Sequence, residues 1–227
     1  MQQIYTPPLT QTNKFLLIAL GVSFVVTSVA GQFLGAPLAA YLGLSTHGLS
    51  KGLIYQLLSY PLASQGLLEV VFNGLLVWFI GGDIELLWGR KKYLTFLIFC
   101  TLVSALSFLA ISGLFFQGQA LLLGPRGLAS ALLLVYALYY PERHFTFMLI
   151  IPMPAKYFCA LLIAMEIYTG VFTPFAAQAW GHLGALAGAY LFFRSGGKWN
   201  SLFAFFGRKR PQKGRGKLSL VQDGQEK

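Results

Sequence analysis

The sequence predicts an all-α membrane protein, built as a bundle of six transmembrane helices. Three observations predict this fold class. The composition is 56% hydrophobic and only 11% charged, with a mean hydropathy of +0.64, which is far more apolar than a soluble domain. Six apolar runs approach or reach the length of a membrane span. The basic residues then fall almost entirely on one side of the membrane.

The expected spans follow the apolar runs along the chain. They cover residues 15–34, 67–84, 93–116, 127–140, 155–172 and 180–193. The fourth and sixth have roughly 14 residues each, whereas a full span needs about 20. Short spans imply local thinning of the bilayer or burial among neighbouring helices. We expect a membrane domain at 15–194, preceded by a cytoplasmic N-terminal segment at 1–14.

The distribution of lysine and arginine predicts the orientation. With six spans, 15 of the 17 basic residues lie on the side that holds both termini. Lys51 lies on the opposite side, and Arg126 lies within the membrane. Because cytoplasmic loops carry the excess of Lys and Arg, we expect a multi-pass protein of the bacterial inner (plasma) membrane, with both termini cytoplasmic.

Two segments outside the spans have distinct compositions. Residues 36–64 are apolar but too interrupted to span, so we expect short amphipathic helices in the membrane interface. Residues 195–227 form a basic, Gly-rich tail that we expect to be disordered. This tail either attracts anionic lipids or is an ordinary positive-inside tail. We expect no nucleic-acid partner, because no folded nucleic-acid-binding motif is visible.

Polar residues within the spans carry most of the functional information, because polar groups in a bilayer face the bundle interior and need partners. They are Glu69, Asn73, Arg126, Ser130, Glu166 and His182. Glu69 and Asn73 are four residues apart and share a helix face, as do Arg126 and Ser130. The orientation places Glu69, Arg126 and His182 at a similar depth near the outer surface. Glu166 is expected to hydrogen-bond within the bundle or to lie near that surface.

Small residues surround two of these positions. Gly184 and Gly188 are four residues apart after His182, a spacing that lets another helix approach closely. Gly124 and Gly127 flank Arg126, and we expect them to supply the partner surface for that approach. The two cysteines, Cys100 and Cys159, lie in apolar runs and are expected to be free and buried. We expect no metal or cofactor.

These motifs, in this order, resemble the rhomboid family of intramembrane serine proteases over residues 53–193. In that family the second span carries a His and an Asn four residues apart, followed by a Gly- and Glu-containing turn, for which this chain has residues 81–93. The fourth span opens with Gly-x-Ser-Gly, whose Ser is the nucleophile. A Pro-containing loop like residues 151–156 precedes the fifth span. The sixth span carries the general-base His among small residues, as at His182. The resemblance implies a six-helix rhomboid-like bundle with an interfacial loop between helices 1 and 2.

Two positions depart from the family pattern. Arg126 replaces the nucleophile in Gly124-Pro125-Arg126-Gly127, and Glu69 replaces the His of the second span. Asn73, which matches an oxyanion-stabilising amide of the family, is retained, as is His182. Arginine has no acceptor and stays protonated, so it cannot attack a carbonyl. Ser130 lies about 6 Å deeper, whereas nucleophile and base must meet within about 3 Å, so we do not expect it to substitute.

The departures suggest a new role for the site. Glu69 and Arg126 carry opposite charges, and each would be costly alone in the membrane. We therefore predict a Glu69–Arg126 ion pair across the degenerate site, with Asn73 and His182 completing the network.

The resemblance implies a rhomboid-like pseudoprotease that binds transmembrane segments of client proteins without cleaving them. Its expected partners are transmembrane helices of other membrane proteins, a membrane-anchored protease or other membrane complex among them. One alternative is an active rhomboid serine endopeptidase with a non-standard nucleophile. The other is a polar intramembrane pathway for a small solute, which would need polar groups in both membrane halves.

Overall fold

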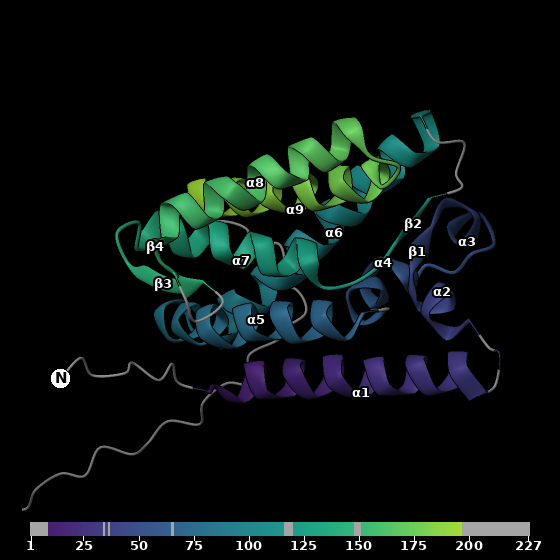
Figure 1. Ribbon diagram of the computed structural model, residues 1–227, viewed down its shortest axis with the longest axis horizontal. Helices are drawn as coiled ribbons and strands as arrows, with labels where there is room; N and C mark the ends of the chain where they lie inside the picture. Colours follow the sequence, from purple (N-terminus) through teal and green to yellow (C-terminus); the bar gives the residue numbers. More distant parts are fainter. Residues whose placement is uncertain are drawn as a thin grey trace, which may run out of the picture.

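The computed structural model describes residues 9–33, 35, 37–64, 66–115, 120–147 and 151–196, so most of the predicted basic tail lies outside the described residues. Six long helices form the bundle (Figure 1). They are α1 (Gln11–Phe33), α5 (Leu67–Trp88), α6 (Arg90–Phe115), α7 (Arg126–Tyr139), α8 (Ala155–Phe172) and α9 (Ala176–Arg194). The predicted all-α membrane bundle is confirmed, and each of the six apolar runs contains a helix.

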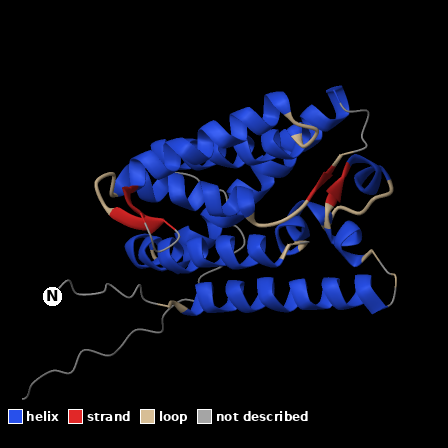
Figure 2. Cartoon of the chain, viewed as in Figure 1, coloured by secondary structure: helices blue, strands red, loops and turns tan. Residues whose placement is uncertain are grey.

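Short elements lie at the two ends of the bundle. Between α1 and α5 are α2 (Leu38–Leu42), β1 (Leu44–Ser45), α3 (Thr46–Ser50), α4 (Gln56–Ser59) and the 3-10 helix η1 (Tyr60–Leu62). The strand β1 pairs antiparallel with β2 (Leu121–Leu122), and β3 (His144–Phe147) pairs with β4 (Ile151–Pro154). The expected short helices in 36–64 are therefore present, whereas the two strand pairs were not predicted. Figure 2 shows these pairs at opposite ends of the helical bundle.

We name the two ends by their content. The loop end carries α2, α3, α4, η1 and the β1–β2 pair. The basic end carries the β3–β4 pair and seven cations, which are Lys14, Arg90, Lys91, Lys92, Arg143, Lys156 and Arg194. Helix α7 runs from Arg126 at the loop end to Tyr139 at the basic end.

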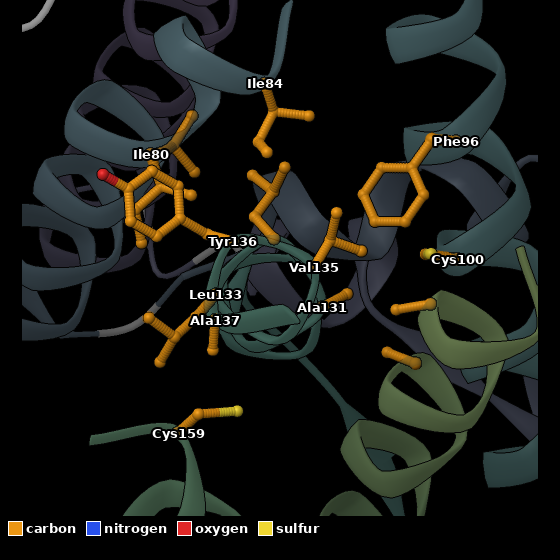
Figure 3. Close-up of a cluster of buried hydrophobic side chains, with 14 of the residues drawn as sticks. Ile80, Ile84, Phe96, Cys100, Ala131, Leu133, Val135, Tyr136, Ala137 and Cys159 are labelled. Carbon is orange, nitrogen blue, oxygen red and sulfur yellow. The ribbon is translucent and has the colours of Figure 1, made fainter. Parts of the chain in front are cut away.

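Helix α7 occupies the centre of the bundle. It packs against α5, α6, α8 and α9. Figure 3 shows α7 along its axis, with Ile80 of α5 and Phe96 of α6 on two sides and Cys159 of α8 on another. Nine of its 14 residues are buried, so its side chains meet protein in nearly every direction.

The central position of α7 explains how the short spans fit. Among the described residues, four helices are long and apolar enough to cross a membrane, and they are α1, α5, α6 and α8. Helix α7 is shorter than these four, and α9 is not among them. In α9, 11 of the 19 residues are buried. Burial among neighbouring helices, one of the two predicted solutions for short spans, therefore applies to both.

Glycines set how closely α9 approaches its neighbours. A Cβ on Gly184 would lie 2.3 Å from the Cβ of Ser107, and one on Gly188 would lie 3.1 Å from the Cβ of Val103. Both neighbours belong to α6, so the prediction that this glycine pair would meet Gly124 and Gly127 is wrong. Gly127 does face α9, because a Cβ there would lie 3.2 Å from His182 Cδ2 and 3.4 Å from the Cβ of Ala185. Close packing by small residues thus joins α9 to α6 and α7 on different faces.

Polar contacts tie α1 to the bundle at the basic end. The hydroxyl of Tyr93 donates to Asn13 Oδ1 at 2.7 Å, and both residues are buried. Thr12 at the start of α1 donates to the buried carboxylate of Glu85. Gly81 makes room for the Tyr93–Asn13 hydrogen bond, because a Cβ there would lie 2.5 Å from the Tyr93 hydroxyl. Residues 81–85 are helical and do not form the expected turn. Helix α5 ends at Trp88 and is capped by Gly89, whose φ is +78°.

The α6–α9 contact gives a stability prediction. The change Gly184→Ala forces a Cβ into Ser107 and should lower the free energy of unfolding by about 1–3 kcal/mol. The matched control is Gly113→Ala on α6, whose Cβ would meet no atom within 4 Å. That substitution should be neutral or stabilising by up to about 1 kcal/mol through helix propensity. Unfolding titrations in detergent micelles measure both, and equal effects of the two variants would contradict the close packing.

Candidate functional site

Arg126 is positioned by a turn that the loop end holds in place. Gly124, with φ +84°, donates its backbone N–H to the carbonyl of Tyr60 at 3.0 Å. The β1–β2 pair fixes the chain just before this turn. Pro125 caps the helix, so Arg126 is the first residue of α7. The hydrogen bond to Tyr60 and the β1–β2 pair therefore position the backbone of residue 126 independently of its side chain.

The partner of Arg126 is Glu166 on α8. Arg126 Nε lies 2.8 Å from Glu166 Oε1. The other oxygen, Glu166 Oε2, lies 3.2 Å from His182 Nδ1 on α9. Glu166 is 2% exposed and His182 is 5% exposed, whereas 41% of the Arg126 side chain remains accessible. The buried Glu166 carboxylate of α8 therefore contacts both the guanidinium on α7 and the imidazole on α9.

The predicted ion pair between Glu69 and Arg126 is thus corrected. Among the described residues, Glu69 has no cationic nitrogen within 4.0 Å, and Arg126 pairs with Glu166 instead. The Glu69 carboxylate packs against Gly124, where a Cβ would lie within van der Waals overlap of Oε1. Glu69 lies in the first turn of α5, where the helix N-terminus stabilises negative charge without a cation. Glycine at residue 124 therefore allows the positive φ of the turn and also leaves room for the Glu69 carboxylate.

Asn73 and His182 have different relations to this ion pair. The Asn73 side chain donates from Nδ2 to the backbone carbonyl of Glu69 at 2.8 Å, so this hydrogen bond stays within its own helix. His182 joins the pair through Glu166, not through Glu69 or Asn73. The prediction that both residues complete a network is therefore supported for His182 alone.

The Glu166 contact determines the chemistry of His182. An ionised carboxylate only accepts hydrogen bonds, so Nδ1 of His182 donates to Glu166 and this contact orients the ring. Among the described residues, Nε2 is buried and has no hydrogen-bond partner. Ser130 is buried one turn into α7 and is not bonded to it. The site thus has an oriented base but no described hydroxyl within hydrogen-bonding distance of that base.

The Arg126–Glu166 contact can be tested by double-mutant cycles. We expect Arg126→Gln and Glu166→Gln to be coupled by about 1 kcal/mol or more, because either change leaves the other charge without its partner. The matched cycle pairs Arg126→Gln with Glu69→Gln and should give a coupling below about 0.5 kcal/mol. Free energies of unfolding in detergent supply both values. A larger coupling for the Glu69 cycle would restore the partner expected from the sequence.

Comparison with known proteins agrees with the geometry. The model of the Rhomboid domain matches residues 51–196, which is more than half of the chain. No curated protein matches the chain. The match begins near α4, includes the five helices α5 to α9, and contains Arg126, Glu166 and His182. The chain is a multi-pass membrane protein and belongs to the rhomboid family, most of whose members are serine proteases.

Proposed function

We propose that this protein is a rhomboid pseudoprotease, which binds transmembrane segments of client membrane proteins without cleaving them. The observation that carries this proposal is the Arg126–Glu166 ion pair at the position where the family has its nucleophile. A guanidinium has no lone pair to offer a carbonyl carbon. Serine-type hydrolysis also needs a hydroxyl beside the base. His182 therefore keeps the position of a base without a nucleophile to activate.

The ion pair also supports a structural role for the site. Glu166 uses one oxygen for Arg126 and the other for His182. A carboxylate and a guanidinium neutralise each other, so Arg126 supplies the counter-charge that the buried Glu166 needs. The same residues that would orient a catalytic histidine thereby hold α7, α8 and α9 together.

The lateral surface formed by α5 and α8 supports client binding. These two helices contact α7 from different sides (Figure 3). Their exposed faces are rich in large apolar side chains, which are Leu68, Val71, Leu75, Phe79, Leu161, Met165, Tyr168 and Phe172. A client's transmembrane segment would pack against these apolar faces from within the bilayer.

Two other functions have less support. The unpaired Nε2 of His182 is what an active endopeptidase with a non-standard nucleophile would use, but no described hydroxyl lies within reach. A solute pathway would need polar groups through both membrane halves, whereas Arg126, Glu166 and His182 form one cluster. As part of the proposal, the protein lies in a bacterial inner membrane with its basic end and both termini in the cytoplasm.

The absence of hydrolysis gives a direct prediction. Purified protein should not be labelled by a fluorophosphonate probe and should not cleave a generic transmembrane substrate, while an active rhomboid protease in the same detergent does both. The companion variant Arg126→Ser returns a hydroxyl to the start of α7. Labelling of that variant alone would locate the lost reactivity at residue 126. Labelling of the unmodified protein that disappears in Ser130→Ala would show an active enzyme instead.

Client binding is tested by site-specific photocrosslinking in cells. A photoreactive residue at Phe79 of α5 or Met165 of α8 should capture membrane proteins through their transmembrane segments. The matched control is Leu106 on α6, which is 62% exposed but lies on another helix. Enrichment of the same proteins at Phe79 and Met165, and not at Leu106, is the expected result. Equal capture at all three positions would indicate ordinary crowding in the bilayer.

A further inference from the structure

The cations of the basic end differ in whether an acidic partner neutralises them. Arg143 NH1 lies 3.1 Å from Asp83 Oδ2, and Lys156 pairs with Glu142. Within the described ranges, Arg90, Lys91, Lys92 and Arg194 have no carboxylate within 4.0 Å. The nearby carboxylate of Glu85 instead accepts hydrogen bonds from Thr10 and Thr12. A net positive charge therefore remains where α6 begins and α9 ends.

One of these cations lies over a cluster of aromatic rings, and a second follows a residue of that cluster in the chain. Trp88 ends α5, and its indole N–H donates to the Tyr139 hydroxyl at 2.9 Å. Tyr139, the last residue of α7, packs edge-on against Phe193 of α9, with ring centroids 5.2 Å apart. Lys92 Nζ lies 4.8 Å from the centroid of the Trp88 ring, and Arg194 follows Phe193 in the chain. We call Trp88, Lys92, Tyr139, Phe193 and Arg194 the basic–aromatic corner.

The construction of this corner restricts its side chains. The hydrogen bond and ring contacts hold Trp88 and Tyr139 in defined orientations, and Trp88 also packs on Phe96 inside the bundle. The cation–π contact places the Lys92 ammonium over one face of the indole. The ammonium still has donors to offer, because no carboxylate takes them in the described part of the chain.

The surroundings of the corner match the two parts of a phospholipid. Exposed leucines lie in the last turns of the same helices, at Leu87 of α5, Leu138 of α7 and Leu191 of α9. Aromatic residues favour the level of the headgroups, where one part of the ring is apolar and the other is wet. Apolar side chains next to uncompensated cations therefore offer contacts for acyl chains and for a phosphate.

We propose that the basic–aromatic corner binds an anionic glycerophospholipid of the membrane. Lys92 and Arg194 contact the phosphate of the headgroup, the rings of Trp88 and Tyr139 lie at the glycerol level, and the exposed leucines contact the acyl chains. This site consists of residues of α5, α6, α7 and α9 and includes none of the basic tail after residue 196. Charge complementarity favours this partner, because anionic headgroups attract cations close to the membrane surface.

Native mass spectrometry of the full-length chain tests the proposal, with phosphatidylglycerol and phosphatidylcholine as the two lipids. The variant Lys92→Gln/Arg194→Gln should bind phosphatidylglycerol about tenfold more weakly than the unmodified protein. The control Lys51→Gln/Lys156→Gln removes the same total charge, keeps the tail and should bind it with unchanged affinity. Excess inorganic phosphate should not displace the lipid.

Three results would overturn the proposal. The first is equal loss of affinity in both double variants, which would show attraction to net charge without a site. The second is equal binding of phosphatidylcholine by the unmodified protein, because the corner would then not select an anionic headgroup. The third is displacement of the lipid by inorganic phosphate, because the acyl contacts would then contribute nothing. A change of Trp88→Phe gives a second variant, and it should weaken phosphatidylglycerol binding while the bundle stays folded.

Discussion

The loop-end half of the bundle depends on the carboxylate of Glu166. It is 2% exposed, and its two oxygens reach Arg126 on α7 and His182 on α9. A buried carboxylate without partners would cost several kcal/mol or would take up a proton, in the order of magnitude usual for buried charges. The three helices must therefore keep the rotation and depth at which both partners reach it. The close approach of Gly127 to α9 is part of the same constraint, and the turn at Gly124 fixes the start of α7 against Tyr60 and Glu69.

Much of this arrangement could be predicted from hydropathy and charge, whereas the choice of partner could not. Span positions, the interfacial helices and the depth of Arg126 and His182 follow from apolar length and from the distribution of Lys and Arg. The partner of Arg126 depends on how each helix is rotated, which a list of polar residues does not contain. The facing of Glu166 and His182 depends on the observed helix ends, because the sequence placed the start of the sixth span at residue 180. Glu166 lies six residues before the end of α8 at Phe172, and His182 lies six residues after the start of α9 at Ala176. In an antiparallel helix pair this symmetry puts both at about 9 Å from the turn.

The glycines show the same limit from the packing side. The spacing of Gly184 and Gly188 correctly predicts a closely approached helix face, but it does not identify the neighbour, which is α6. Similarly, Gly81 resembles part of a turn in the sequence, yet in the structure it is a helical residue that leaves room for Asn13 and Tyr93. Small residues in a helix indicate that a neighbouring group lies close to that face. Which side chain fills that space depends on contacts far apart in the chain, and these are decided only when the bundle packs.

Arg126 and Glu166 each supply the opposite charge that the other needs within the bundle. With a serine at residue 126, Glu166 would keep only the imidazole of His182 as its partner. With arginine there, the carboxylate has a permanent counter-charge at 2.8 Å. Under the proposed function, arginine at residue 126 leaves no hydroxyl there for hydrolysis and supplies the charge that burial of Glu166 needs. His182 then has a role in packing through its contact with Glu166, so its presence alone does not argue for hydrolysis.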